Sequence, residues 1–255
     1  MNDGAADGRR DEHSAAAGLL LRPERRANAF EETVRRLLQS IRLGLVQPGT
    51  RLPPERELAG MTGVGRDTVR EAIAALSEAG YLVARRGRYG GTFVVDRLPA
   101  PQPLVIGEDG LEPGPEATPE HIRDVLLTRR VVELGIVRAA AEAELSGQDR
   151  DRLWQTHEAC ARAAPDDYRR LDARLHILFA ELTASPTLLE LAADARMRVN
   201  GLLDRIPVLA PNLTHSTEQH EAIVRAILLG RPDEAQERMS EHLEGSEALL
   251  RGFLD

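Results

Sequence analysis

The segment from residue 97 to residue 118 interrupts every regular pattern in this chain of 255 residues. It contains five prolines and three glycines, and neither a helical nor a strand period of apolar residues continues through it. We therefore interpret 97–118 as a linker between two folded units. This division predicts a leader at 1–27, a first unit at 28–96 and a second unit at 119–252.

Charge is distributed unevenly between these units. The whole chain has a formal net charge of −8, and all 33 of its basic residues are arginine. Residues 28–97 nevertheless contain 11 arginines against 8 acidic residues, whereas residues 98–255 contain 17 arginines against 28 acidic residues. This asymmetry indicates that only the first unit meets a polyanion such as nucleic acid.

Three further observations bear on location. The only cysteine, Cys160, excludes a disulfide framework and is typical of a reducing cytosol. No run of about 18 apolar residues is present, so we expect no membrane-spanning segment. The leader mixes acidic residues with arginines, which favours a disordered segment over a signal peptide. We therefore expect a cytoplasmic protein without a membrane partner.

The first unit has the pattern of a winged helix-turn-helix. Apolar spacing and turn residues predict helices at 29–43, 54–62 and 67–79, followed by strands at 81–85 and 92–95. Arg66 and Arg70 then face outward at the start of the third helix, where a recognition helix reaches base edges in the major groove. Arginines of the hairpin suit phosphate or minor-groove contacts. The alternative is a solvated charged face without a ligand.

Three motifs in the first unit are specific to one family. They are G-T-R-L-P-x-E-R-E-L-A from Gly49, V-x-R-x-x-V-R-E-A from Val64, and G-G-T-F-V from Gly90. Over residues 28–96 the chain resembles the DNA-binding domain of GntR-family transcription regulators. The resemblance implies DNA contacts from the residues at the matching positions, which are Arg56, Arg66, Thr68 and Arg70, with the wing at Arg86 and Gly87.

One position departs from the family pattern. GntR-family regulators usually have serine or threonine immediately before the arginine that is Arg66 here, and this chain has Gly65. Glycine still permits a helix N-cap, at a cost of a few tenths of a kcal/mol relative to serine. We expect Asp67, in the first turn, to take over the capping.

The second unit is predicted to be an antiparallel all-α bundle, which makes the chain mainly α. Six helical segments are expected, and a seventh helix is compatible with the pattern. The segments are 119–145, 148–163, 166–184, 187–206, 214–229 and 232–252.

Four polar residues of this bundle form a candidate metal site. Asp172 and His176 lie one turn apart on a largely apolar helix, and His220 and His242 lie on the apolar faces of two later helices. One carboxylate and three imidazoles from three helices suit Zn²⁺ or a similar divalent ion. The alternative is that the histidines are hydrogen-bonded core residues.

The context of these four residues resembles the ligand-binding domain of the FadR-like branch of the GntR family, known as the FCD domain. The resemblance covers residues 119–251 and includes D-x-x-x-H at Asp172, E-x-H-x-x-I at Glu218 and M-x-x-H-L at Met239. In the metal-binding subtype, this set of one aspartate and three histidines binds a divalent metal that helps to hold a carboxylate effector. The resemblance implies Zn²⁺ in first place, with Ni²⁺ or Mn²⁺ as alternatives.

A buried arginine is predicted on the first helix of the bundle. Arg129 and Glu133 fall in the middle of its apolar stripe, whereas Arg130 falls at the edge. Glu133 alone could satisfy the arginine, or Arg129 could also receive the carboxylate of an effector. The R-x-x-x-E pattern recurs in the FCD family, which favours a role for Arg129 in effector binding. Arg198 and Asn200 are further candidates for the cavity lining.

These observations predict a ligand-responsive transcription regulator that is not an enzyme. We expect a repressor that binds a palindromic operator in double-stranded DNA as a homodimer. A small organic carboxylate bound at the metal site would change the placement of the DNA-binding units. Two alternatives remain at this point: a regulator that senses the metal ion itself, and a metal-dependent hydrolase.

Overall fold

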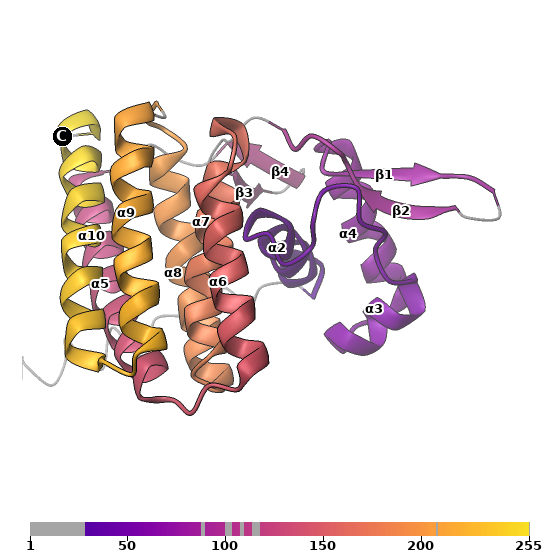
Figure 1. Cartoon of the computed structure of the whole chain (residues 1–255). Helices are drawn as coiled ribbons and strands as arrows, with labels where there is room; N and C mark the ends of the chain where they lie inside the picture. Colours follow the sequence, from indigo (N-terminus) through magenta and orange to yellow (C-terminus); the bar gives the residue numbers. More distant parts are fainter. Residues whose placement is uncertain are drawn as a thin grey trace, which may run out of the picture.

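Two folded units are evident in the computed structural model, which describes residues 29–87, 90–99, 104–107, 110–113, 118–207 and 209–254. A winged helix-turn-helix is followed by an all-helical bundle (Figure 1), which confirms the expected fold class. The predicted leader at 1–27 lies outside the described residues.

The winged helix-turn-helix consists of α2 (Ala29–Arg42), α3 (Glu55–Thr62), α4 (Arg66–Glu78), β1 (Leu82–Arg85) and β2 (Gly91–Val94). Gly63 ends α3 at a φ of 72°, a left-handed conformation that glycine adopts without strain, and its N–H donates to the carbonyl of Ala59. The two strands pair antiparallel with Leu82 opposite Val94. Apolar residues from all five elements form a single buried core, which fixes α4 relative to the wing.

The segment 97–118, interpreted as a linker without a sustained helical or strand period, contains a short β-hairpin. Within this segment β3 (Leu104–Gly107) pairs antiparallel with β4 (Gly110–Pro113), and β4 lies near α4. Strands of four residues are too short for an alternating pattern to show against the prolines and glycines around them.

The bundle consists of six helices among the described residues. Proline occupies the first turn of most of them, where its missing N–H has no helical partner in any case. Thr118 and Ser185 cap two of these helices, and Ser146 and Asp149 form a capping box at a third. The helices are α5 (Pro119–Glu142), α6 (Gly147–Ala161), α7 (Pro165–Glu181), α8 (Pro186–Leu203), α9 (Ala210–Leu228) and α10 (Pro232–Leu254).

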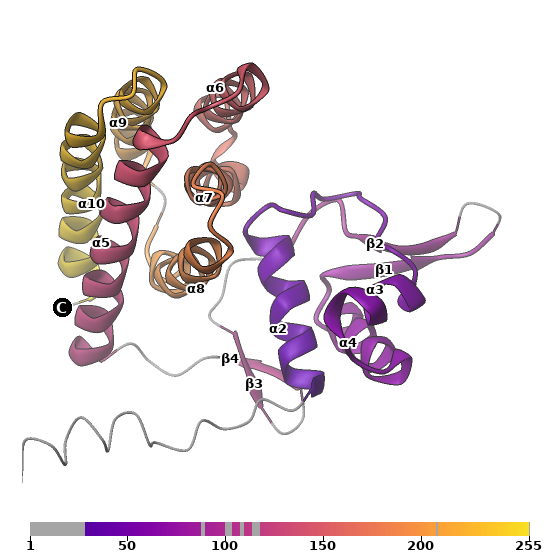
Figure 2. The same ribbon diagram turned by 90° about the horizontal axis from the view of Figure 1, so that it is seen from below.

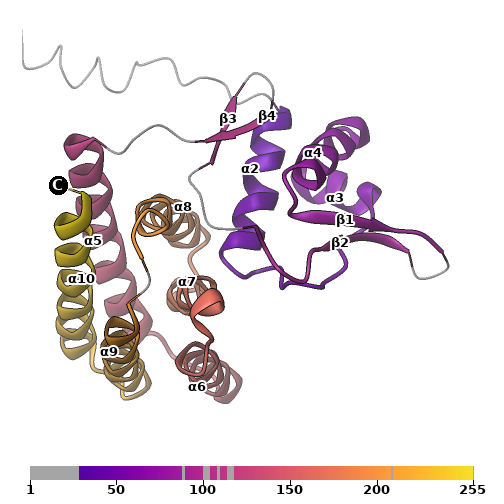
Figure 3. The ribbon, with the colours of Figure 1, turned by 90° about the horizontal axis from the view of Figure 1, so that it is seen from above.

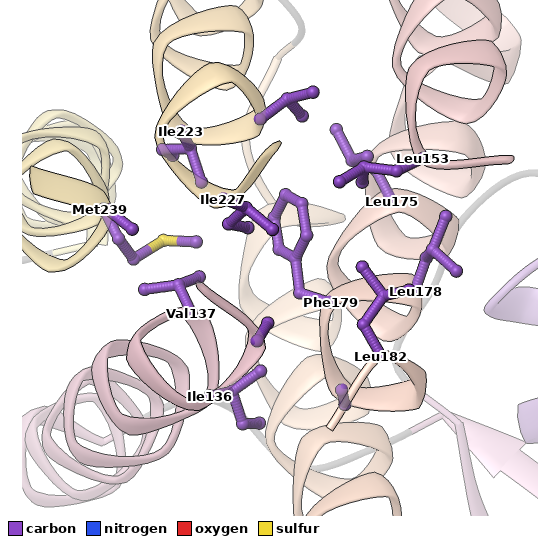
Figure 4. Packing of buried hydrophobic residues seen from close by; sticks show 14 of the residues in the cluster. Ile136, Val137, Leu153, Leu175, Leu178, Phe179, Leu182, Ile223, Ile227 and Met239 are labelled. Carbon is purple, nitrogen blue, oxygen red and sulfur yellow. The ribbon is translucent and has the colours of Figure 1, made fainter. Parts of the chain in front are cut away.

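The main core of the bundle forms around α7. Phe179 lies between the apolar side chains of the neighbouring helices, with Ile227 of α9 on one side and Leu178 of its own helix close by (Figure 4). Since α7 is buried on most of its circumference, its polar residues Asp172 and His176 are also enclosed.

Replacement of Phe179 by alanine is expected to destabilise the bundle by about 3–5 kcal/mol, because it leaves a large cavity in a close-packed core. The measurement is urea unfolding followed by circular dichroism, with the metal content of both proteins held equal. Phe253→Ala is the control, since that side chain is 50% exposed and its loss should change the stability by less than about 0.5 kcal/mol. A similar small change for Phe179→Ala would contradict the packing described here.

The two units contact each other through α2 and the turn that follows it. α2 lies beside α8 in two opposite views (Figures 2 and 3). Leu43 is fully buried and belongs to the apolar core of the bundle. Arg42 forms an ion pair with Asp204, and Arg170 donates a hydrogen bond of 2.7 Å to Gln47. The DNA-binding unit is therefore docked on α7 and α8.

Candidate functional site

Asp172, His176, His220 and His242 meet inside the bundle. The first two come from consecutive turns of α7, and the histidines at 220 and 242 come from α9 and α10. All four side chains are buried, and one potential ligand atom from each lies within 4.8 Å of all the others. The spacing along the sequence therefore identified residues that the fold brings together.

The distances inside this cluster fit a divalent metal ion. Oδ1 of Asp172 lies 3.3 Å from Nε2 of His220 and 3.7 Å from Nε2 of His176, and the two Nε2 atoms are 3.3 Å apart. Zinc bonds of about 2.0–2.1 Å in a tetrahedral site place neighbouring ligand atoms roughly 3.3 Å apart. Asp172, His176 and His220 are therefore already near this spacing, and the ligand atom of His242 lies within 4.8 Å of all three.

Side chains around the cluster contact the candidate metal ligands and fix their orientation. Oδ2 of Asp172 forms a close ion pair with Arg196, which leaves Oδ1 to face the histidines. Oε2 of Glu133 lies 2.8 Å from Nδ1 of His176, at ion-pair distance although not in hydrogen-bond alignment. Oε1 of Gln219 lies 3.2 Å from Nδ1 of His242. Such outer contacts fix the tautomer and the orientation of a metal-binding histidine.

Burial and neighbouring charges hold Asp172, His220 and His242 in the protonation states that bind metal. Burial lowers the pKa of His220 to about 3 and holds the pKa of His242 well below its usual value, so both imidazoles are neutral at pH 7. Burial alone would raise the pKa of Asp172, but the positive charge of Arg196 opposes this effect and the pKa stays low. Asp172 therefore offers a carboxylate, and His220 and His242 offer neutral imidazoles.

Arg129 is buried as predicted and lies beside this cluster. Its side chain is 3% exposed, its Nη1 donates a hydrogen bond of 2.7 Å to Ser246, and its Nε lies 3.4 Å from Oε1 of Glu133. Arg130 is more exposed and contacts Ser240 and Glu244 on the surface.

Arg196 is a site residue that the sequence reasoning missed. It is fully buried and lies between Asp172 and Glu133. The signal that could have found it is its position in the middle of the apolar stripe of α8, which includes Ala192 and Val199. The other two candidates on α8 do not line the cavity: Arg198 is half-exposed and pairs with Asp194, and Asn200 is buried elsewhere in the core.

A cavity of about 170 Å³ opens beside the cluster. Asp172, His242 and Arg129 contribute to its wall, and so do Tyr168 and Arg169 from the preceding turn of α7. Most of the remaining wall is apolar and comes from α8, α9, α10 and the connection between α8 and α9. Pockets for drug-sized ligands measure about 300–1,000 Å³, so this cavity suits a small molecule.

The winged helix-turn-helix presents arginines on its surface. Arg56 on α3 and Arg66 and Arg70 on α4 are exposed, Thr68 is half-buried, and Arg86 and Gly87 are exposed at the end of β1. Arg70 contacts Glu55 and Asp67, each at 3.1 Å. The expectation that Asp67 caps α4 is wrong, because its carboxylate faces Arg70 and the N-cap is Gly65, with a φ of −67° and no side-chain hydrogen bond.

A winged helix with exposed arginines, joined to a helical bundle with an enclosed polar site, defines a two-domain regulator that binds DNA. Comparison with known families gives the same result. Residues 30–94 match the family described as bacterial regulatory proteins, gntR family, and residues 124–245 match the FCD domain. The chain belongs to the GntR family of transcription regulators and has an FCD domain.

Several named relatives are similar over most of the chain. The chain is 34% identical to the putative HTH-type transcriptional regulator RmpR of Mycobacterium gastri, over 86% of this chain and 77% of that protein. It is 30% identical to the HTH-type transcriptional repressor NanR of Escherichia coli, over 98% of this chain and 95% of NanR. The solved structure of E. coli McbR/YncC shares the fold, with a TM-score of 0.53 and 18% identity, over 88% of this chain and 98% of that one.

These findings decide between regulator and enzyme. The matched domains and the named relatives are those of transcription regulators, so the chain is a regulator and the hydrolase alternative is discarded. None of the helices in the described part of the chain is long and apolar enough to cross a membrane.

Proposed function

We propose that this regulator represses transcription by binding a palindromic operator as a homodimer, and that a small carboxylate bound in the FCD domain releases it. The observation that carries this proposal is the cavity whose wall contains Asp172 and His242 of the metal cluster together with Arg129. Binding of the operator does not itself require such a cavity, and a mainly apolar wall with a few charged residues suits a small signal molecule. We expect the protein to act in the cytoplasm.

The four clustered residues would hold the metal ion. Imidazole and carboxylate ligands suit Zn²⁺ first, and Ni²⁺ or Mn²⁺ are alternatives. A bound divalent ion would supply a positive centre for one carboxylate of the effector. Arg129 would donate charge-assisted hydrogen bonds to the same group, since its guanidinium lies in the cavity wall.

The DNA-binding residues are proposed from their exposure and position. Arg66 and Arg70 lie at the N-terminal end of α4, which enters the major groove in this fold, and Arg56 lies on α3 beside it. Thr68 would contact the DNA from the same turn of α4. Arg86 and Gly87 at the wing would contact phosphates or the minor groove.

One contact connects the cavity with the DNA-binding domain. Asp204 pairs with Arg42 of α2. Leu203, directly before Asp204, and Ile206, two residues after it, line the cavity. An effector that contacts this wall can therefore favour one placement of α2 over another. Such coupling requires that the effector bind the two placements with different affinities.

A thermal-shift screen of small carboxylates, with and without added metal, tests this function. The panel includes L-lactate, because one relative, 28% identical over 92% of this chain, is named a putative L-lactate dehydrogenase operon regulatory protein of E. coli. We expect at least one acid to raise the melting temperature only when metal is present, and to release the operator. Operator binding that depends on metal, with no response to any acid, would instead support the metal-sensing alternative.

Replacement of Arg129 by glutamine is expected to weaken binding of that acid by roughly 10- to 100-fold, because a charge-assisted hydrogen bond is worth about 1.5–3 kcal/mol. Titration calorimetry of the metal-loaded proteins measures the effect. Arg130→Gln is the matched control, since this arginine is adjacent in sequence but contacts only surface groups. Equal losses in both variants would contradict the role of Arg129.

A further inference from the structure

The cavity contains a second arginine, Arg169, that does not contact the metal cluster. Arg169 lies on α7 three residues before Asp172, so the two side chains leave the same face of the helix on neighbouring turns. Both residues line the cavity. The side chain of Arg169 is 18% exposed, so its guanidinium is largely removed from bulk water.

The other arginines at this site have carboxylates of their own. Arg196 forms a close ion pair with Asp172. Arg129 and Arg196 each lie 3.4 Å from Oε1 of Glu133. Two buried carboxylates therefore balance these two buried guanidiniums, before any metal ion is considered.

Arg169 is not balanced in this way. Its Nε lies 4.0 Å from Oδ1 of Asp204, at the outer limit of an ion pair, and the same carboxylate makes its close contact with Arg42. Its Nη2 donates a hydrogen bond of 2.8 Å to the carbonyl of Ile206. No hydrogen bond from its Nη1 is made within the described part of the chain. Asp204 therefore serves two arginines, and a largely buried guanidinium is left without a full counter-charge.

We propose that Arg169 binds a second anionic group of the effector, so that the effector is a compact acid with two anionic groups. This inference rests on the proposed function, in which the first carboxylate binds at the metal cluster and Arg129. Arg169, Arg129 and Asp172 line one cavity of about 170 Å³, and this small volume favours a short acid. Dicarboxylates have two such anionic groups, and so do acids that carry one carboxylate and one phosphate.

Paired ligands that differ by one anionic group test the proposal. The zinc-loaded protein is titrated with succinate and butyrate as one pair, and with phosphoglycolate and glycolate as the other. We expect the dianionic acid of at least one pair to bind about 10- to 100-fold more tightly, the range of one charge-assisted contact. The pair that shows the preference identifies the second group as carboxylate or phosphate.

Variants then assign the preference to Arg169. Arg169→Gln should remove the preference for the dianionic acid and leave the affinity for the monoanionic acid unchanged. Arg169→Lys keeps the positive charge and should retain part of the preference. Arg174→Gln is the matched control, because this arginine of the same helix is similarly buried, pairs with Glu181 and does not line the cavity.

Two results would overturn the proposal, and they can be told apart. If the wild-type protein binds both acids of each pair equally, the second anionic group is excluded while the proposed carboxylate response stands. If none of these acids and none of the carboxylates in the thermal-shift panel binds the metal-loaded protein, the proposed function fails as well. Both results come from the wild-type protein, so they do not depend on the folding of any variant.

Discussion

Arg70→Ala is expected to weaken specific operator binding by about 5- to 150-fold per half-site, which corresponds to a loss of ~1–3 kcal/mol of base discrimination. Arg70 lies at the N-terminal end of α4, and its side chain is 58% exposed, so it can reach a base edge in the major groove. Because a homodimer would carry the substitution in both half-sites, the loss for the whole operator should be larger than for one.

The contacts of Arg70 in the free protein do not prevent this role. Its ion pairs with Glu55 and Asp67 are exposed, and exposed ion pairs are worth about 0–1 kcal/mol. Giving them up therefore costs less than a bidentate contact to guanine gains. For the same reason, the loss of these pairs in Arg70→Ala should leave the fold and the oligomeric state unchanged.

Fluorescence anisotropy with the operator sequence that the wild-type protein selects from random DNA measures the effect. Arg238→Ala is the matched control, because Arg238 is also an exposed helical arginine with a local acidic partner, Glu241, but lies in the bundle. All proteins are measured at the same salt concentration, because affinity for DNA depends strongly on ionic strength. Under these conditions only Arg70→Ala should bind the operator more weakly than the wild-type protein. Wild-type affinity in Arg70→Ala would exclude α4 as the recognition helix.

The features predicted well from the sequence are those that depend on local periodicity. The buried face of α4, with Val69, Ala72 and Leu76, follows from helical spacing alone. The cluster of Asp172 with three histidines was anticipated because each histidine lies on an apolar stripe, where burial of a polar side chain is costly unless it has a partner. Helix ends differ from the expected ones by a few residues, because capping and fraying act at the level of single residues.

The features that escaped prediction depend on residues far apart in the sequence. Arg42 and Asp204 are separated by most of the chain, and no local pattern indicates that they pair between domains. The environment of Glu133 is a similar case. The sequence left open whether it serves only Arg129, whereas in the fold it lies beside Arg129, Arg196 and His176 together. Only the packing of three helices determines how one carboxylate is shared.

Purified protein is expected to hold about one divalent ion per chain, and His220→Ala should lose most of it. Removing an outer-shell contact typically weakens metal binding 10- to 100-fold, so removing a ligand should cost more than about 100-fold. Elemental analysis and titration with Zn²⁺, Ni²⁺ and Mn²⁺ measure the occupancy. His121→Ala is the control, because His121 is an exposed histidine on α5 outside the cluster.

Metal binding should also raise the melting temperature of the protein. Free metal at 100 times its dissociation constant adds about 2.7 kcal/mol to the stability of the folded state. For a chain of this size that corresponds to a rise of roughly 5–10 °C in melting temperature. The rise should be absent in His220→Ala, and chelation of the wild-type protein should reverse it.

Removal of the metal by a chelator should not unfold the bundle. This result would distinguish a metal ion that takes part in effector binding from one that the domain needs in order to fold. Without an ion, Asp172 is still neutralised by Arg196, and burial keeps His220 and His242 uncharged. Loss of the ion therefore leaves no unpaired charge on Asp172, His220 or His242, and the helical content by circular dichroism should match that of the loaded form. If wild-type protein binds none of the three ions even after reconstitution, the histidines are core residues. In that case the carboxylate response would have to depend on Arg129 and Arg169 alone.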